Sequence, residues 1–372
     1  FAKFDSEGPC HNGMGLRRHI VPIALILVFL LLARQIYPYS TPSNEVLVDG
    51  YEIEKVVGGL GGPTCMEWDE PGNLLMCDRD GDRIILFNTS DDFSQSTILE
   101  GLNNPHGIHI TVDHLFISES GTLSKYDRGV DWELTNRTVL IDNVPTGNHQ
   151  TNAINALPNG SLIWHVGSTC NVCQEEDTRN AALLWVNPVD GEHGVIASGV
   201  RNSFDGVWVE SMGYIFTDNG RDFDGDHPPE EINLLIEGES YGWPDDEPET
   251  PVPAGTQGPV ATWTAHTSVN GIDVRPQNSS LPGLSEGSGH TVYATVYGSW
   301  NTVLPQGHQL LRIDFTPLFD LDGNFSGWDS ETSLFAQDLG TPLPLRFSPS
   351  GDLYYAIFGN GGTLYKVSST QS

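Results

Sequence analysis

The densest run of polar residues in this 372-residue sequence lies between positions 217 and 233. Oxygen ligands at such a density suit Ca²⁺. An EF-hand is excluded, because its loop needs Gly at the sixth position and this run, counted from Asp222, has His227 there. We therefore expect either a calcium site of another kind or a solvated acidic loop. The carboxylates of the run are Asp222, Asp224, Asp226, Glu230 and Glu231.

Two residue pairs elsewhere have types suited to acid–base chemistry and to anion binding. His149 precedes Gln150 at the predicted start of a strand, where an imidazole can act as a general base near neutral pH. Arg201 precedes Asn202, and in a chain with 17 Lys and Arg this pair is a candidate anion clamp. A hydrogen-bonded structural His and an ordinary salt bridge are the respective alternatives. Hydride chemistry with a nicotinamide has no support, because no nucleotide-binding loop is present.

The composition limits the partners of the protein. The chain has 49 Asp and Glu against 17 Lys and Arg, a formal net charge of −32. A chain with this negative charge does not suit nucleic-acid binding, since phosphate binding needs clustered Lys and Arg. We expect no nucleic-acid partner. With 38% hydrophobic residues, the chain has enough apolar material for one or two real cores.

The N-terminal segment has the order of an export signal. Arg17, Arg18 and His19 precede an apolar run over residues 20–33, which is shorter than the roughly 20 residues that a transmembrane helix needs. We interpret residues 1–13, which precede Met14, as upstream read-through and residues 14–40 as a signal peptide or short membrane anchor. We expect a periplasmic or extracellular location. If the segment is an anchor, residues 20–33 tether the protein to the membrane.

The cysteines agree with export. Cys65 and Cys77 are twelve residues apart in a strand-turn-strand pattern and can meet across a hairpin, while Cys170 and Cys173 can close a small loop. A zinc site built from these four residues is the alternative, and it would require two distant segments to converge.

The body, residues 41–372, has an all-β pattern. Short runs rich in β-branched and aromatic residues alternate with turns of Gly, Asp, Asn and Pro. Six units repeat this pattern, each too small to bury its own apolar face, which predicts a six-bladed β-propeller with four-stranded blades. A pair of β-sandwiches is the alternative. The units span residues 63–88, 105–127, 149–187, 202–236, 269–315 and 342–367.

Several motifs, taken in order, resemble the soluble quinoprotein glucose/sorbosone dehydrogenase family, in particular its sorbosone-dehydrogenase-like branch. The resemblance extends over residues 58–367 and implies a propeller that binds pyrroloquinoline quinone (PQQ) and Ca²⁺ and oxidises an aldose or sugar aldehyde. It also implies an electron acceptor, quinone or cytochrome-like, as a partner. The motifs are Gly167-Ser-Thr-Cys-Asn-Val-Cys173, Arg201-Asn202, the run 217–233, Tyr241-Gly-Trp-Pro244 and Gly298-Ser-Trp-Asn301.

The resemblance assigns roles residue by residue. It makes His149 the catalytic base and Arg201 both a catalytic residue and a cofactor contact. It places the cofactor-bound Ca²⁺ on the backbone carbonyls of Gly220 and Arg221, and a structural Ca²⁺ at Glu231 and the backbone of Tyr241. The further predicted cofactor contacts are Gln150, Asn202, Trp300, Asn301 and Arg346.

The sequence also departs from the family pattern. Asp205 stands where the family has Gly, Thr302 replaces a basic residue, and Tyr297 replaces a His. In the last unit Thr341 replaces an Arg, which leaves Arg346 as the nearest cation. Because PQQ carries three carboxylates, these losses keep two alternatives open: an extracellular binding module without catalysis, and a metal-dependent propeller lactonase.

Overall fold

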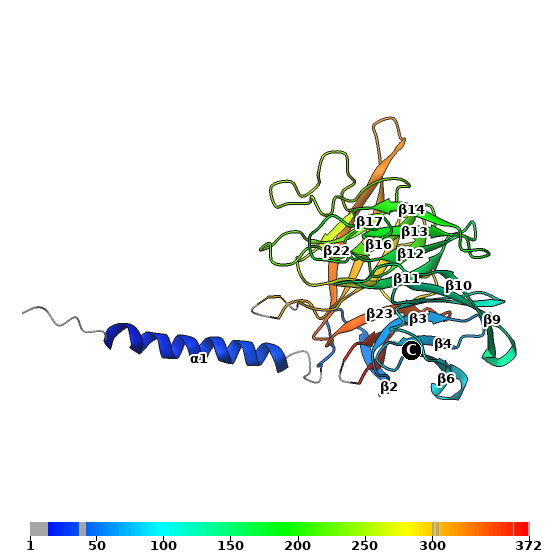
Figure 1. Cartoon of the computed structure of the whole chain (residues 1–372), viewed down its shortest axis with the longest axis horizontal. Coiled ribbons are helices and arrows are strands. Elements are labelled where there is room, and N and C mark those ends of the chain that lie inside the picture. Colours follow the sequence, from blue (N-terminus) through cyan, green and yellow to red (C-terminus); the bar gives the residue numbers. More distant parts are fainter. Residues whose placement is uncertain (1–13, 37–41, 300, 303–304, 360, 371–372) are drawn as a thin grey trace, which may run out of the picture.

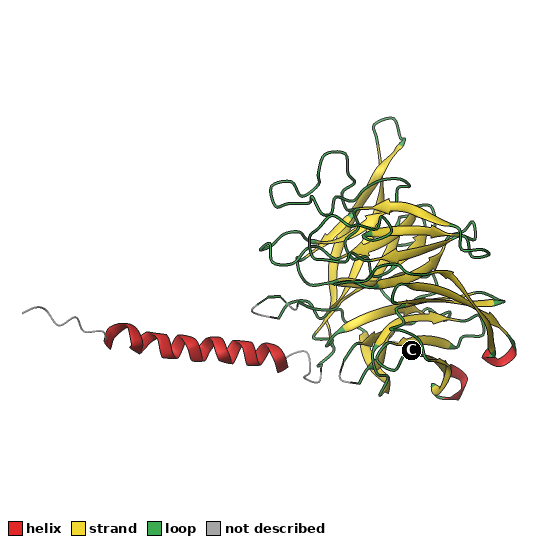
Figure 2. Cartoon of the chain, in the orientation of Figure 1, coloured by secondary structure: helices red, strands yellow, loops and turns green. Residues whose placement is uncertain are grey.

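The apolar runs of the sequence form the strands of six antiparallel sheets in the computed structural model, which describes residues 14–36, 42–299, 301–302, 305–359 and 361–370. The regular structure of the body is almost entirely strand, joined by long loops; among the described residues, helix occurs in α1 (Met14–Ile36) and in two short 3-10 turns, Thr89–Asp91 and Val130–Trp132 (Figure 2). The prediction of an all-β body is confirmed.

Each sheet is one blade, and we number the blades 1 to 6 along the chain. Blade 1 has strands β3 (Pro63–Trp68), β4 (Leu74–Asp78), β5 (Arg83–Asn88) and β6 (Ser94–Glu100). Blade 2 has β7 (Gly107–Ile110), β8 (His114–Glu119), β9 (Thr122–Arg128) and β10 (Leu134–Ile141). Blade 3 has β11 (Thr151–Ala156), β12 (Leu162–Val166), β13 (Ala182–Val186) and β14 (His193–Ser198).

The second half repeats this arrangement. Blade 4 has β15 (Gly206–Val209), β16 (Gly213–Asp218), β17 (Glu230–Leu234) and β18 (Ala261–Trp263). Blade 5 has β19 (Val269–Val274), β20 (His290–Val296), β21 (Gln309–Phe319) and β22 (Phe325–Gln337), with the short β1 (Glu45–Val46) on its outer edge. Blade 6 has β23 (Pro342–Phe347), β24 (Leu353–Ile357) and β25 (Thr363–Ser369), and β2 (Tyr51–Gly58) supplies its outermost strand.

The ring closes through its innermost strands. β3, β7, β11, β15, β19 and β23 contact one another in this order, and β23 contacts β3 again. Because β2 comes from the start of the body and pairs with β25 near its end, the two ends of the ring are fastened within one sheet. The predicted six-bladed propeller with four-stranded blades is thus confirmed.

The core consists of six apolar clusters, one between each pair of neighbouring blades. Strand β4 shows how one strand supplies two of them. Leu74 and Met76 pack toward blade 6, whereas Leu75 and Cys77 pack toward blade 2. Successive side chains of a strand point to opposite faces, so a strand buried on both faces must be apolar throughout. This explains the unbroken apolar runs of the sequence.

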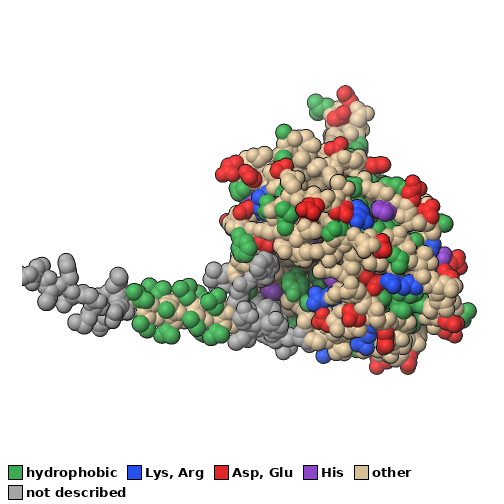
Figure 3. Space-filling view, viewed as in Figure 1, with side chains coloured by type: hydrophobic (Ala, Val, Ile, Leu, Met, Phe, Trp, Pro, Cys, Tyr) green, Lys and Arg blue, Asp and Glu red, His purple; other side chains and the backbone are tan. Residues whose placement is uncertain are grey.

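The basic and apolar N-terminal segment forms α1, which projects from the body (Figure 1). Its apolar side chains from Ile20 to Leu32 are exposed, whereas acidic side chains are spread over the visible face of the body (Figure 3). No helix in the part of the chain that the structure describes is long and apolar enough to cross a membrane.

Both expected disulfides are formed. Cys65 and Cys77 are cross-strand partners in blade 1 and are bonded to each other, and Cys170 is bonded to Cys173 in the loop after β12. A zinc site built from these four cysteines, the alternative reading of the sequence, is therefore wrong.

Candidate active site

Loops from blades 3, 4 and 5 surround a cavity of about 440 Å³. Loops that precede the inner strands β11, β15 and β19 lie at the same end of the propeller as loops that follow β12 and β16, because neighbouring strands are antiparallel. A second cavity of about 230 Å³ shares His149 and Asn202 with the first and extends across the ring to blades 1 and 6. The lining of the first cavity is Asn148, His149, Asn171, Arg201, Asn202, Asn219, Gly220, Asp222, Phe223, Glu230, His266 and Ser268.

The hydrogen bonds of His149 determine its tautomer. Its Nδ1 lies 2.7 Å from Ser168 Oγ and 3.1 Å from the Ser168 carbonyl oxygen. Ser168 Oγ donates its one hydrogen to the carbonyl oxygen of Cys170, at 2.8 Å. Both partners of Nδ1 are therefore acceptors, so Nδ1 carries the proton and Nε2 has an open lone pair. An imidazole in this tautomer can accept a proton from a substrate.

His149 is also kept neutral. Burial, and secondly the positive charge of Arg201, lower the pKa of His149 to about 3. Gly167 leaves room for the His149 side chain, because a Cβ at position 167 would lie 2.6 Å from His149 Cβ. His149 thus has the protonation state of a general base throughout the neutral range.

Arg201 is buried and held by four hydrogen bonds of its guanidinium. Nε and Nη2 donate to the carbonyl and side-chain oxygens of Asn171, at 3.1 and 2.8 Å. Nη1 donates to the Asn219 carbonyl, at 3.1 Å, and Nη2 also pairs with Asp222 at 3.0 Å. A guanidinium has five N–H groups, so one of them is left for a ligand. The predicted anion clamp is a positioned charge beside His149 with most of its donors already in use.

Asn202 is fixed at the cavity wall by its neighbours. Asp218 accepts hydrogen bonds from the backbone N–H groups of Arg201 and Asn202, at 3.0 and 2.7 Å. The Asn202 side chain accepts a hydrogen bond from Asn152, at 3.1 Å. Asp218 therefore orients the segment that carries both predicted contacts.

A group of buried carboxyls lies beside the cavity, and its chemistry suits a cation, although these carboxylates are not among the groups of three or more described side chains whose ligand atoms lie within 4.8 Å of one another. Burial is the main cause that raises the pKa of Asp218 and of Glu230 to about 7 and that of Glu231 to about 8, and neighbouring carboxylates add to each shift. Three oxygens here are buried without a hydrogen-bond donor: Asn219 Oδ1, Glu230 Oε2 and Asn233 Oδ1. Oxygen atoms in need of positive charge are what Ca²⁺ binds.

The predicted calcium ligands are close to this group. Gly220 lines the cavity, and Glu231 accepts a hydrogen bond from Asn233 at 3.1 Å. Arg221 directs its side chain to Asp246 and the Pro244 carbonyl, each at 2.7 Å. The Tyr241 hydroxyl donates to the Leu234 carbonyl and accepts from the Ile236 N–H, and the calcium contact predicted for its backbone stays a prediction.

The structure brings together most of the predicted cofactor contacts. Gln150 lines the second cavity and accepts a hydrogen bond from Ser120, at 2.7 Å. Asn301 donates to Asp222 at 3.1 Å and so supports the partner of Arg201. Trp300 lies outside the described residues.

Arg346 does not line either of these two cavities, and its cofactor contact stays a prediction. It pairs with both carboxylate oxygens of Asp205, at 2.5 and 3.0 Å, and donates to the Ile272 carbonyl. Asp205 stands where a Gly was expected, and its buried charge attracts the nearest cation of blade 6. The departure at Asp205 thus forms an ion pair between blades 4 and 6.

The sequence analysis missed three residues that hold the site. Asn171 and Asp222 bind Arg201, and Ser168 orients His149. Ser168 and Asn171 lie within the motif 167–173 and Asp222 within the acidic run, so the segments were found but the roles were not. The roles depend on which groups meet in the fold, and for Asn171 partly on its backbone carbonyl, which residue types do not reveal.

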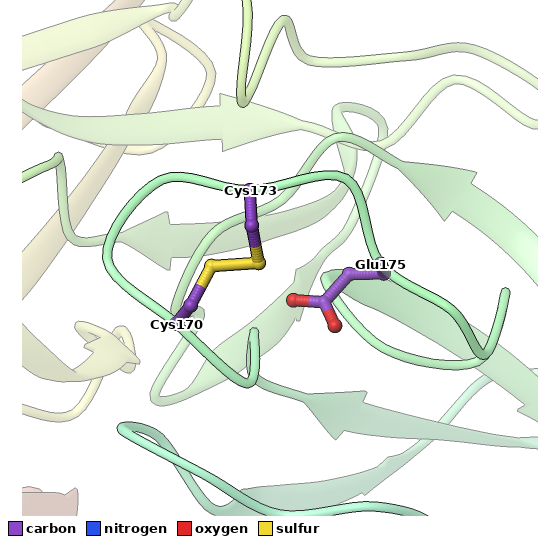
Figure 4. Close-up of side chains that lie close together, drawn as sticks. All are labelled: Cys170, Cys173 and Glu175. Carbon is purple, nitrogen blue, oxygen red and sulfur yellow. A yellow bond between two sulfur atoms is a disulfide. The ribbon is translucent and has the colours of Figure 1, made fainter.

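One side-chain cluster in the described part of the chain has the spacing of a metal site, and it is formed by Cys170, Cys173 and Glu175. The ligand atoms of the three residues lie within 4.8 Å of one another. The two sulfurs are bonded to each other, and the Glu175 carboxylate lies beside them (Figure 4). The disulfide removes the thiolates that a metal would need.

The fold is shared with several solved structures. The PQQ domain of pyranose dehydrogenase from Coprinopsis cinerea, in its holo form, has a TM-score of 0.71 at 17% identity. A calcium structure of a Trichoderma reesei carbohydrate-active enzyme of family AA12 has a TM-score of 0.70 at 18% identity. The PQQ-bound aldose sugar dehydrogenase of Streptomyces coelicolor has a TM-score of 0.65 at 19% identity. Each alignment covers 88% of this chain and 98% of the other. No curated protein matches the sequence.

The solved structures of similar fold include PQQ-bound sugar dehydrogenases, which agrees with the resemblance of the sequence motifs to the quinoprotein glucose/sorbosone dehydrogenases. A family model described as TrAA12-like matches residues 45–245. The chain belongs to the TrAA12-like family.

Proposed function

We propose that the protein is an exported oxidoreductase that oxidises an aldose or related sugar aldehyde with PQQ and Ca²⁺. The observation that carries the proposal is the tautomer of His149, whose Nε2 is an open acceptor at a polar cavity beside a positioned Arg. When bound, PQQ supplies a two-electron acceptor and Ca²⁺ polarises it. The proteins of similar fold named above include PQQ-bound and calcium-containing forms, which supports this cofactor pair.

The residues of the chain divide the remaining work. His149 Nε2 takes the proton of a sugar hydroxyl, and burial together with the charge of Arg201 keeps the imidazole unprotonated at neutral pH. Arg201 places a fixed positive charge in a buried position, where it stabilises negative charge that develops nearby. The backbone carbonyls of Gly220 and Arg221 would hold the Ca²⁺ of the cofactor, and the carboxylate of Glu231 a structural one.

Export is supported by two features. The basic and then apolar order of residues 17–33 is that of an export signal. The two disulfides are typical of proteins in an oxidising compartment. We expect electrons to pass on to a quinone or cytochrome-like acceptor.

A second candidate function is carbohydrate binding without catalysis. It is favoured by one observation, the pairing of Arg346 with Asp205, which removes a cation that the three carboxylates of PQQ would otherwise meet.

Dye reduction by the full chain, loaded with PQQ and Ca²⁺ and supplied with a panel of aldoses, tests the proposal. His149→Ala should lose roughly 10²-fold or more in kcat while its melting temperature is retained. The matched control is His193→Ala, since His193 lies on β14 at the outer edge of blade 3 and bonds to the Gly191 carbonyl. Equal turnover of His149→Ala and wild type would refute the assignment of the base. Sugar binding without dye reduction in the wild type would favour the second candidate.

A further inference from the structure

The loop between β12 and β13 contains a four-residue ring, Cys170–Cys173, closed by its disulfide. The loop is fastened on its other side by Glu175, which accepts hydrogen bonds from the backbone N–H and the hydroxyl of Thr169, both at 2.7 Å. Figure 4 shows the Glu175 carboxylate beside the disulfide. The ring thus sits in a loop held from both sides, within the wall of the cavity.

Asn171, inside the ring, binds three separate segments of the site. Its carbonyl oxygen accepts hydrogen bonds from Arg201 Nε and from the indole N–H of Trp243, both at 3.1 Å. Its side-chain oxygen accepts from Arg201 Nη2 at 2.8 Å and from the backbone N–H of Asp222 at 2.9 Å. Half of the guanidinium's four hydrogen bonds therefore end on this one residue, and so does the backbone of the carboxylate that pairs with it.

Cys170 acts on the other catalytic group. Its carbonyl oxygen takes the only hydrogen of the Ser168 hydroxyl, which forces Ser168 Oγ to accept from His149 Nδ1. If the carbonyl of Cys170 moved away, Ser168 Oγ could donate to Nδ1 instead, and only the Ser168 carbonyl, at 3.1 Å, would still favour a proton on Nδ1. The same ring thus contributes both to the tautomer of His149 and to the position of Arg201.

We propose that the disulfide ring Cys170–Cys173 is a positioning device for the active site, with Asn171 as its positioning residue, so that opening the ring releases both His149 and Arg201. This inference rests on the proposed function for its catalytic meaning, but the geometry it describes belongs to the apoprotein. Opening is a two-electron, two-proton reduction of the S–S bond to two thiols by an added phosphine or dithiol reductant.

The two disulfides differ in a way that makes the inference testable. Cys170 and Cys173 are half-buried and flank Val172, which is exposed, whereas Cys77 is fully buried and Cys65 nearly so. A reductant added to the folded protein should therefore open the ring first. Mass spectrometry after thiol alkylation identifies which pair has reacted.

The first readout needs no cofactor. In the ¹⁵N-His-labelled full-length apoprotein, the imidazole signals of His149, assigned by their loss in His149→Gln, should show the Nδ1–H tautomer and no titration between pH 5 and 8. In the reduced protein and in Cys170→Ser/Cys173→Ser, these signals should change tautomer populations or titrate. Cys65→Ser/Cys77→Ser and Val172→Ala are the matched controls, and both should behave as the wild type does.

The second readout separates Asn171 from the fold in general. Because Asn171→Ala removes three side-chain hydrogen bonds, one of them donated by the charged Arg201, it should weaken PQQ binding, followed by absorbance, by roughly tenfold or more. Asn171→Asp keeps the oxygen that accepts from Arg201 and from the Asp222 N–H and loses only the donor of the long bond to the Asp222 carbonyl, so it should restore binding, which a merely structural role would not predict. Circular dichroism confirms that each variant is folded.

The outcomes distinguish the two proposals. If the wild type binds no PQQ, the proposed function fails. The imidazole signals of His149 alone then test whether the disulfide ring positions the site. If ring-opened protein keeps the His149 signals of the wild type, the positioning role is refuted, whatever the cofactor does. If Asn171→Ala and Asn171→Asp bind PQQ equally well, Asn171 is not the positioning residue.

Discussion

The ion pair between Asp205 and Arg346 offers a prediction whose magnitude follows from the structure. Asp205 is buried, with a side-chain exposure of 6%, and its two oxygens meet the two Nη atoms of Arg346. Arg346→Met leaves this carboxylate buried without its cation. Removal of one partner from a buried pair costs about 3–5 kcal/mol, whereas an exposed pair is worth about 0–1 kcal/mol. Because the Arg346 side chain is 20% exposed, we expect about 3 kcal/mol.

Thermal unfolding of the apoprotein, followed by circular dichroism at pH 7, measures this effect. With an entropy of unfolding of about 2.1 cal/mol/K per residue over a body of roughly 330 residues, a loss of about 3 kcal/mol corresponds to a decrease in melting temperature of roughly 4 °C. The double variant Asp205→Asn/Arg346→Met removes the uncompensated charge and should be more stable than Arg346→Met alone. PQQ affinity of Arg346→Met, measured below its melting temperature, should match that of the wild type.

Two results would refute this reasoning. A decrease of less than about 1 kcal/mol, or additive losses in the double variant, would mean that the pair behaves as a surface salt bridge. A selective loss of PQQ affinity in Arg346→Met would support the cofactor contact of Arg346 that the sequence predicted.

Two further predictions concern the cation and the base. The pKa values of Asp218, Glu230 and Glu231 are raised to about 7–8 in the folded apoprotein. The folded protein therefore binds more protons than the unfolded chain does between about pH 4.5 and 8, and its free energy of unfolding should fall as the pH rises through this window. Ca²⁺ should then raise the melting temperature more at pH 8 than at pH 5, and an equal increase at both pH values would contradict the assignment of these carboxyls to a cation site. Gly167→Ala places a Cβ 2.6 Å from His149 Cβ and should lower turnover while the protein still folds. The control is Gly129→Ala at a distant turn, and unaltered kcat in Gly167→Ala would show that His149 has more room than the structure allows it.

The sequence was sufficient to predict the fold because the blades are built from strands buried on both faces. Runs such as Leu74–Cys77 must be apolar throughout, and their regular spacing between turns marks the blades. The pairing of β2 with β25 could not be predicted in this way, because it joins segments more than 300 residues apart whose side chains carry no mark of their partner.

The sequence predicted site residues that are distinguished by their side chains, but it did not predict the hydrogen bonds to backbone carbonyls that position them. His149, Arg201 and Asn202 were found by residue type and lie together at the cavity. The pairing of Arg346 with Asp205 could not be predicted, because the two residues are 141 positions apart and meet only when the ring closes. Asn171 was missed because half of its hydrogen bonds to Arg201 come from its carbonyl group, which every residue has.

Absorbance titration of the purified full-length apoprotein with PQQ, with and without Ca²⁺, tests the central claim most directly. The account predicts saturable PQQ binding that depends on Ca²⁺. Arg201→Ala should lower the PQQ affinity because it removes a proposed cofactor contact, whereas Glu231→Gln should lower it only as far as it destabilises the fold. Absence of binding at high PQQ, with Ca²⁺ present and the protein folded, would contradict the assignment of this propeller as a quinoprotein.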